Sequence, residues 1–352
     1  MKSTNDFNLG KNTTILVTGC AGFIGAAVVI GLIKDGYKVV GIDNLNDYYD
    51  ISLKKNRLKN IQVQAELLNA KFHFDELCIT KKQLIEKFFI EHKPDICIHL
   101  AAQAGVRYSL INPHSYADNN LMGFSNILEA CRKNNIKHLV YASSSSVYGG
   151  NRKVPFSEKD AVNHPVSFYG ATKKANELMA HTYSHLYGLS ATGLRFFTVY
   201  GPWGRPDMAP MIFAKAIMEG KALEIFNYGK MQRDFTYIDD IVSGIIKCSQ
   251  KPATSNPLFD ELNPDPATSF APHRIFNIGN SNSVKLMRFI EILEETLKIK
   301  SKMIMREMQP GDVVETLSDS SELESWTGFR PSTSIESGTE KFVAWYKDYL
   351  GK

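Results

Sequence analysis

The chain has 352 residues, of which 43% are hydrophobic and 22% are charged. This length exceeds the roughly 250–300 residues that a single hydrophobic core usually serves, and 24 Gly with 14 Pro is an ordinary content, which excludes collagen-like, fibrous and disordered proteins. The 41 Lys and Arg residues nearly balance 37 Asp and Glu, and a net charge of only +4 argues against a nucleic-acid-binding protein.

Short β-branched runs alternate with amphipathic stretches through the first 200 residues, which is typical of βαβ units around a parallel sheet. Six such segments predict an α/β, doubly wound Rossmann-type fold, in which ligands bind beyond the carboxyl ends of the strands. The predicted strands are Thr14–Thr18, Lys38–Asp43, Lys71–Leu77, Ile96–Ala101, His138–Ser143 and Thr192–Val199. The predicted helices include Ile24–Asp35, Thr80–Glu91, Ser115–Lys133 and Phe168–Tyr187.

Two further segments stand out along the chain. The basic stretch Lys54–Arg57 lies in an apparent helix and is interpreted as a solvated face. After Tyr200 the elements become shorter and less regular, and Asn256–Pro272, with four prolines, reads as a long loop.

Membrane insertion and export are not expected. No apolar run approaches the roughly 20 residues that cross a bilayer, and the first 14 residues contain no apolar stretch typical of a signal peptide. The five cysteines are odd in number and form no C-x-x-C pair, which argues against disulfides and a zinc site. We therefore expect a cytoplasmic protein with neither a membrane nor a nucleic-acid partner.

Three glycines, Gly19, Gly22 and Gly25, follow the first strand and open the first helix. Glycines at such a turn allow the backbone to approach a pyrophosphate closely, and the helix N-terminus favours the phosphate charge. Asp43 ends the second strand, where a carboxylate can accept hydrogen bonds from a ribose diol and would repel a 2′-phosphate. This predicts NAD rather than NADP, unless Asp43 only caps a helix.

Tyr169 and Lys173 form a Y-x-x-x-K pattern on a predicted helix, so their side chains share a face. A nearby ammonium favours the phenolate, which would make the tyrosine a usable general base. The run Ser143–Ser146 ends the fifth strand, where doubly wound folds place their ligands.

With these motifs the chain resembles the extended short-chain dehydrogenase/reductase superfamily along nearly its whole length. Four longer motifs, at His99–Ser109, Leu194–Met208, Asn263–Asn280 and Gln309–Val313, resemble those of UDP-glucuronate 4-epimerases. The resemblance implies catalytic roles for Tyr169, Lys173, Ser144 and Ser145. It implies NAD-binding roles for Gly19, Gly22, Phe23, Ile24, Gly25, Asp43, Asn44, Cys78, Ile79, Leu100, Ala101, Ala102, Gln103, Tyr169 and Lys173. It implies substrate-binding roles for Ser144, Ser145, Thr198, Arg205, Arg233, Gln309, Asp312 and Arg107.

The reaction implied by the resemblance is C4 epimerization of UDP-glucuronate to UDP-galacturonate. Tyr169 would remove the C4 hydroxyl proton while hydride passes to NAD, and hydride would return to the other face of the 4-keto sugar. Because this intermediate is a β-keto acid that can decarboxylate, Thr198, Ser145 and Arg205 are candidates to restrain its carboxylate. Arg205 offers a planar fork suited to a carboxylate, although it could instead bond turn carbonyls.

The alternatives are a UDP-glucose/UDP-galactose-type epimerase, a UDP-glucuronate decarboxylase, or an NAD-binding protein without catalysis. Related dehydratases usually have Asp-Glu, and decarboxylases Ser-Glu, where this chain has Ser145-Ser146, which argues against both. At Cys78 relatives usually have Asp, and because a thiol is a poor acceptor we expect a weaker adenine contact there.

The remaining expectations concern metals, assembly and domains. His181 and His185 stand one helical turn apart, but no third ligand is evident and no metal site is expected. The helices Ser115–Lys133 and Phe168–Tyr187 resemble those of a four-helix homodimer interface. The expected domains are an NAD-binding domain, 11–200 with a return segment 234–270, and a nucleotide-sugar domain, 201–233 with 271–350.

Overall fold

A seven-stranded sheet forms the larger part of the protein, and every pair of neighbouring strands in it is parallel. The computed structural model describes residues 10, 12–309 and 311–351, so the N-terminal residues 1–9 and Pro310 of the fourth motif lie outside the described residues. In sheet order, the strands are β10 (His273–Ile278), β6 (Ala191–Phe196), β5 (His138–Ser144), β4 (Ile96–His99), β1 (Thr14–Thr18), β2 (Lys38–Asp43) and β3 (Phe72–Glu76). This order confirms the doubly wound fold and adds β10 to the six predicted strands.

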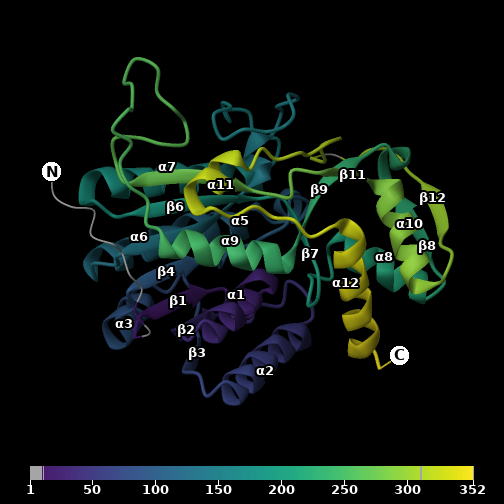
Figure 1. Ribbon diagram of the computed structural model, residues 1–352, viewed down its shortest axis with the longest axis horizontal. Helices are drawn as coiled ribbons and strands as arrows, with labels where there is room; N and C mark the ends of the chain where they lie inside the picture. The colour runs from purple at the N-terminus through teal and green to yellow at the C-terminus, as the bar shows by residue number, and fades with distance from the viewer. Residues whose placement is uncertain (1–9, 11, 310, 352) are drawn as a thin grey trace.

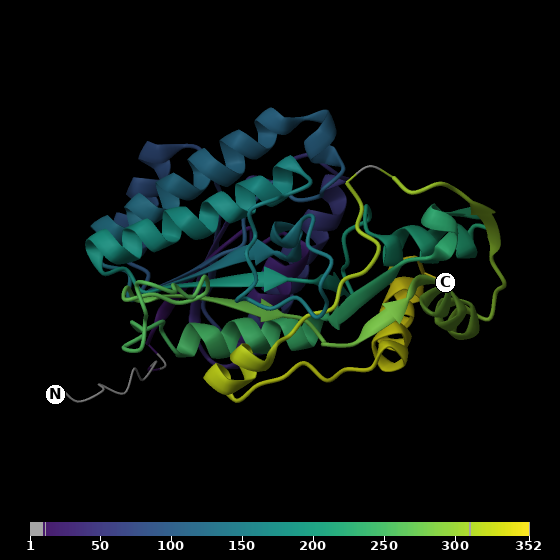
Figure 2. The same ribbon diagram turned by 90° about the horizontal axis from the view of Figure 1, so that it is seen from above.

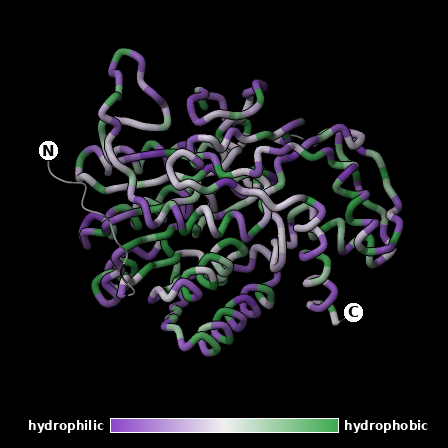
Figure 3. Tube along the Cα trace, in the orientation of Figure 1, coloured by the Kyte–Doolittle hydropathy of each residue, from purple (hydrophilic) through white to green (hydrophobic). Residues whose placement is uncertain are grey.

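Helices cover both faces of this sheet (Figures 1 and 2). On one face α1 (Phe23–Lys34) packs against α2 (Ile51–Leu67) and α9 (Ile238–Gln250). On the other face α6 (Phe124–Lys133) packs against α3 (Lys82–His92) and α7 (Phe168–Tyr187). Because both faces are covered, β1 and β4 are fully buried, and hydrophobic residues gather in the centre of the fold (Figure 3).

The helix predicted over Ser115–Lys133 is not a single α-helix. The short helices α4 (Tyr108–Ile111) and α5 (Pro113–Tyr116) come first, and a π-helical segment, η1 (Ala117–Gly123), connects α5 to α6. Single π-helical turns of this kind are rare and often lie at functional sites.

The smaller part contains two further sheets. The strand predicted over Thr192–Val199 is divided between β6 and β7 (Thr198–Tyr200), because the residue between them, Phe197, turns into a separate apolar cluster with Tyr148. The three-stranded sheet has the order β11 (Ser283–Lys285), β9 (Gln232–Tyr237) and β7, and the other sheet pairs β12 (Lys302–Met305) with β8 (Ala222–Ile225). Around them lie α8 (Ala209–Met218), α10 (Leu286–Leu297), α12 (Ile335–Tyr349) and the 3₁₀ turn η3 (Phe226–Gly229). In the larger part, α11 (Ser321–Thr327) packs against β10 and α9, and the 3₁₀ turn η2 (Ser145–Tyr148) packs against α7.

We propose the domain division expected from the sequence with one change. Because β10 is hydrogen-bonded to β6 in the large sheet, the segment that returns to the NAD-binding domain extends to Ile278. The loop at 256–272 contains neither helix nor strand, as expected. Within the part of the chain that the structure describes, no helix is both long and apolar enough to cross a membrane.

The basic stretch on α2 is only in part a solvated face: Lys55 and Asn56 are exposed, but for Lys54 and Arg57 the interpretation was wrong. Arg57 is 1% exposed and Lys54 is also buried. The Arg57 guanidinium donates to the carbonyl oxygens of Ala21, at 3.1 Å, and Trp203, at 2.7 Å. These bonds offset the cost of burying the cation, and they join α2 to the loop after β1 and to the segment after β7.

A buried ion pair connects α7 to the sheet. Arg195 on β6 is 0% exposed and Glu177 on α7 is 1% exposed, with Nε to Oε1 at 2.8 Å and Nη2 to Oε2 at 3.0 Å. Ser143 at the end of β5 donates to the same carboxylate at 2.7 Å. Burial alone would raise the pKa of Glu177, but Arg195 and these hydrogen bonds hold it below its usual value.

Replacing Arg195 with Met should lower the free energy of unfolding by about 3–5 kcal/mol, because it leaves the buried Glu177 carboxylate with only the partly exposed ammonium of Lys174, at 3.3 Å, as a cation. Urea unfolding at pH 7 measures this loss. The matched control is Arg288→Met, whose ion pairs are exposed and should contribute at most about 1 kcal/mol. Since the pKa of Glu177 is lowered in the folded state, its contribution should be present at neutral pH and disappear on acidification. Equal losses in both variants would contradict this account.

Candidate active site

A cavity of about 970 Å³ lies beyond the carboxyl ends of the central strands and reaches to the smaller part. It is lined by the ends of β1, β2, β4 and β5 and by residues from β7 to β9. Among the residues predicted from the sequence, those that line it are Gly19, Gly22, Phe23, Ile24, Gly25, Asp43, Asn44, Ile79, Leu100, Ala101, Ala102, Gln103, Arg107, Ser144, Ser145, Tyr169, Lys173, Thr198, Arg205, Arg233, Gln309 and Asp312. Cys78 alone does not line it.

The glycine-rich turn joins β1 to α1. Gly19 has a φ of +72°, and a Cβ at Gly25 would lie 2.0 Å from the Gly19 carbonyl oxygen, so the turn and the helix pack as only glycine allows. Gly22, at the N-cap of α1, has no side chain to bond the first N–H groups of the helix. The first turn of α1 also contains no acidic residue. The N-terminus of this helix is therefore suited to bind the pyrophosphate of a dinucleotide.

Asp43 lies beside this turn at the end of β2. Its carboxylate accepts hydrogen bonds from the backbone N–H groups of Ala21, at 3.1 Å, and Leu45, at 2.9 Å. Burial raises the pKa of Asp43, while these two hydrogen bonds and the Lys54 charge act against the rise. A carboxylate has about four acceptor positions, so two remain to bind a ribose diol.

Cys78, for which we expected an adenine contact, does not line the cavity. Its thiol accepts a hydrogen bond from the Asn44 amide at 3.6 Å and lies 3.1 Å from the Thr80 hydroxyl. The wall of the cavity at this point is formed by its neighbours Leu77 and Ile79.

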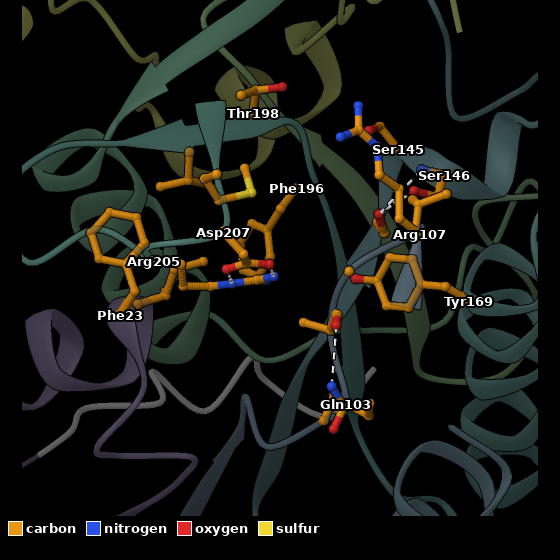
Figure 4. A pocket seen from close by; sticks show the side chains of 18 of the residues that line it. Phe23, Gln103, Arg107, Ser145, Ser146, Tyr169, Phe196, Thr198, Arg205 and Asp207 are labelled. Atoms are coloured by element: carbon orange, nitrogen blue, oxygen red, sulfur yellow. Dashed lines mark hydrogen bonds and ion pairs between the residues drawn. The ribbon is translucent and has the colours of Figure 1, made fainter. Parts of the chain in front are cut away.

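The three residues predicted for proton transfer lie together on one wall. The Tyr169 hydroxyl points into the cavity (Figure 4). It forms a hydrogen bond with the Ser144 hydroxyl. Lys173, one turn along α7, donates to the Ala142 carbonyl oxygen at 2.9 Å, and burial lowers its pKa to about 8. Such a group of a phenol, a hydroxyl and an ammonium can exchange a proton with a ligand hydroxyl.

Burial raises the pKa of Tyr169, which is the opposite of the direction expected from Lys173. The hydrogen bond from Ser144 and the charge of Arg205 act against this rise. Removal of the phenolic proton therefore depends on positive charges and hydrogen-bond donors near the hydroxyl, because these lower the pKa of Tyr169.

Asn120 is a site residue that the sequence interpretation missed. From the π-helical segment its amide accepts from the backbone N–H of Gln103, at 2.8 Å, and donates to the carbonyl oxygen of Gln103, at 3.0 Å. It also donates to Thr172 on α7 at 3.1 Å. Asn120 thus fixes the cavity wall after β4 relative to the helix that carries Tyr169.

On the opposite wall, the fork of Arg205 is occupied by a neighbour. Its Nε donates to Asp207 at 3.0 Å and its Nη2 donates to the other carboxylate oxygen, which also accepts from Tyr48 (Figure 4). Thr198, at the start of β7, lines the same side. The partner of Arg205 was therefore missed, although Asp207 is two residues away within the second quoted motif.

The far end of the cavity carries the remaining predicted residues. Arg107 forms an ion pair with Asp312 at 3.0 Å. Arg233 donates to the carbonyl oxygens of Gln232 and Val314, and burial lowers its pKa. The side-chain oxygen of Gln309 is buried without a hydrogen-bond partner among the described residues, so it is free to accept from a ligand.

Comparisons with known proteins agree with this arrangement. The family model described as "NAD dependent epimerase/dehydratase family" matches residues 15–279. Protein CapI of Staphylococcus aureus is 50% identical over 96% of this chain and 99% of its own length. UDP-glucuronate 4-epimerase 2 of Arabidopsis thaliana is 47% identical over 96% of this chain and 77% of its own length.

Solved structures are similar as well. The crystal structure of UDP-glucuronic acid 4-epimerase from Bacillus cereus, in complex with UDP-glucuronic acid and NAD, has a TM-score of 0.83 and 32% sequence identity. The match covers 96% of this chain and 100% of that chain. The similarity therefore extends over both the large sheet and the smaller part.

Replacing Asp43 with Asn should weaken NAD binding and reduce the preference for NAD over NADP. A hydrogen bond to a charged group contributes about 1.5–3 kcal/mol, so the Kd for NAD should rise about tenfold to a hundredfold. Isothermal titration of both dinucleotides measures the two Kd values. Asp35→Asn, at the exposed end of α1, is the matched control and should leave both unchanged. Tighter binding of NADP by the unaltered protein would contradict the assignment.

Proposed function

Because the chain belongs to the NAD-dependent epimerase/dehydratase family, we propose that it converts UDP-glucuronate to UDP-galacturonate by inverting the configuration at C4. The observation that carries this proposal is that one cavity has two walls with different chemical groups. One wall holds Ser144, Tyr169 and Lys173 for proton transfer, and the other holds Thr198 and Arg205 for a carboxylate. The UDP-glucuronate 4-epimerases among the relatives support the same substrate.

NAD is the cofactor that the glycine-rich turn and Asp43 would hold. When bound, NAD accepts the hydride from C4 and returns it. The open N–H groups at the start of α1 would bind its pyrophosphate. Gln103, fixed by Asn120, and Ile79 would form the walls on either side.

Tyr169 would act as the general base and then as the general acid at the C4 oxygen. Ser144 would share the hydrogen bond of that oxygen, so the proton moves over a short and fixed path. Lys173, one turn along α7, would favour the phenolate through its charge. Ser144 and Lys173 are buried and Tyr169 is partly buried, which would limit the access of bulk water to the keto sugar and so its side reactions.

The sugar carboxylate would be bound mainly by hydroxyl groups. The Nε and Nη2 of Arg205 already donate hydrogen bonds to Asp207. Of the three guanidinium nitrogens, Nη1 makes no such bond to Asp207 and would be the one to reach the substrate carboxylate. Thr198 and Ser145 line the cavity nearby and can donate without adding charge. Ser145 and Ser146 stand where related decarboxylases and dehydratases have acidic residues, and hydroxyls there restrain the carboxylate without repelling it.

The nucleotide diphosphate would occupy the far end of the cavity. Arg233 supplies a buried cation for the diphosphate, which would restore the charge that burial disfavours. Asp312 would accept from the uridine ribose, with Arg107 as its ion-pair partner. Gln309 would use its free side-chain oxygen as an acceptor.

We further propose a homodimer that assembles through α7 and the helix formed by η1 and α6. These helices lie side by side on one face of the sheet (Figure 2). Leu178 and Leu186, two turns apart on α7, are each 59% exposed, and Met122 on η1 is 60% exposed. A second copy of the same face would bury these side chains and form a four-helix bundle.

The cytoplasmic location expected from the sequence stays a proposal. It is supported by the cysteines, because all five are free thiols and four of them are buried as small apolar side chains.

The function is tested by incubating the purified protein with UDP-glucuronate and separating the products by HPLC. UDP-galacturonate is expected. Tyr169→Phe should lower kcat at least about a hundredfold, as loss of a general base does, whereas the control Tyr187→Phe on the same helix should not. UDP-xylose would instead indicate decarboxylation, turnover of only UDP-glucose or UDP-galactose would indicate a neutral-sugar epimerase, and inertness toward all of them would indicate a binding protein.

The dimer is tested by light scattering after size exclusion. The unaltered protein should have twice the mass of one chain, and Leu178→Asp with Leu186→Asp should shift it to the monomer, because two charges would be buried without partners. Leu258→Asp, on the exposed loop, is the matched control. A monomer in the absence of any substitution would remove the proposal.

A further inference from the structure

A cluster of two imidazoles and a carboxylate lies outside the cavity, between the edge of the large sheet and the end of α3. His73 and Asp75 are two residues apart on β3, so their side chains project from the same face of the strand. His92 is the last residue of α3. The three potential ligand atoms all lie within 4.8 Å of one another.

The separations within this cluster match those of ligands around a single ion. The His73 Nε2 lies 3.1 Å from one oxygen of Asp75, and the His92 Nε2 lies 3.7 Å from the other. Zinc binds imidazole nitrogen and carboxylate oxygen at about 2.0–2.2 Å, so two ligands of a tetrahedral ion lie about 3.3 Å apart. The observed distances fall on either side of this value.

The His92 imidazole supplies a second, independent observation. Its Nε2 is buried, yet it has no hydrogen-bond partner among the described residues. The distance of 3.7 Å to Asp75 is too long for a hydrogen bond. The ring is held in this orientation by stacking between Phe88 and His73, with ring centroids at 4.3 and 4.6 Å. A buried nitrogen that is oriented toward a carboxylate and bonded to nothing is suited to coordinate an ion.

We propose that His73, Asp75 and His92 bind one divalent transition-metal ion of the zinc class. Two imidazoles and one carboxylate are a ligand set that Zn²⁺ uses with a water molecule in the fourth position. Solvent can reach that position, because the His73 side chain is 49% exposed. Magnesium and calcium are not expected to compete, since both prefer oxygen ligands.

This site departs from the expectation of no metal, which considered the five cysteines and the pair His181 and His185. In the structure His181 bonds the Ser269 hydroxyl at 2.9 Å, and the His185 ring packs edge-on against Phe270. Neither ring is directed at a carboxylate in these contacts. The two-residue spacing of His73 and Asp75 on a predicted strand is the sequence signal for the other cluster, whereas His92 comes to it only through the fold.

The ion would join the edge of the sheet to the helix that follows it. β3 lies at the edge of the large sheet, and among the described residues β2 is its only neighbouring strand. His73 and Asp75 belong to β3, whereas His92 belongs to α3, and an ion bound by all three prevents the two elements from separating. The expected consequence is a higher unfolding temperature in the presence of zinc.

The test uses the full chain without an affinity tag, after removal of metals with EDTA. Calorimetric titration with ZnCl₂ should show one saturable site per chain, and zinc should raise the unfolding temperature. His92→Gln and Asp75→Asn should each weaken binding at least about tenfold and abolish the thermal shift. His185→Gln and His114→Gln are matched controls, and they should bind zinc like the unaltered protein.

Titration with CoCl₂ identifies the ligands. Visible bands of a tetrahedral cobalt ion with nitrogen and oxygen ligands are expected, and they should be lost in His92→Gln. A thiolate-to-cobalt charge-transfer band would place the ion at a cysteine such as Cys78 and overturn the proposal. Absence of saturable zinc binding, or binding that is unchanged in both His92→Gln and Asp75→Asn, would overturn it as well. Circular dichroism of the variants without metal checks that each of them is folded.

Discussion

The ion pair between Glu177 and Arg195 determines where the reactive side chains lie. Glu177 follows Lys173 by one helical turn, and the residue that donates to it, Ser143, directly precedes Ser144. One carboxylate therefore fixes the register of α7 against β5 and β6 at the same time. Arg195 also donates to Tyr148, whose hydroxyl donates to Asn277 on β10, so the network crosses three neighbouring strands. Charged groups buried this deeply tolerate few alternative packings, which keeps the proton-transfer residues in one arrangement.

A second constraint is the internal pairing of charge within the cavity. Arg205 pairs with Asp207, and Arg107 pairs with Asp312. In the part of the chain that the structure describes, Arg233 bonds only to carbonyl oxygens. For the proposed substrate, this leaves the full positive charge at the diphosphate end and a nearly neutral environment at the sugar end. A weakly charged environment suits a keto acid intermediate, because a strong cation beside its carboxylate is not needed once hydroxyls bind it. The overall charge of +4 says little about this local distribution.

Much of the fold could be predicted because buried parallel strands and amphipathic helices have distinct periodicities. β1, β2 and α7 have the predicted bounds, and the glycine-rich turn and the Y-x-x-x-K pattern are local features that a short segment fully specifies. What the sequence did not reveal depends on contacts between distant segments. Arg57 is buried because carbonyl oxygens from two loops meet it, and no local pattern on α2 encodes those loops. The π-helical turn that places Asn120 and the division of one strand at Phe197 arise in the same way.

That division has a mechanical consequence. β6 ends at Phe196 and β7 begins at Thr198, so a single residue links the seven-stranded sheet to the three-stranded sheet. Consecutive Cα atoms across a trans peptide are 3.8 Å apart, which makes this link inextensible. The two sheets therefore cannot move apart at Phe197, and this residue would be the pivot of any rotation of one sheet relative to the other. Any opening of the cavity would be greatest far from this pivot, at the end that holds Arg233 and Asp312, while Thr198 would keep its distance from β6.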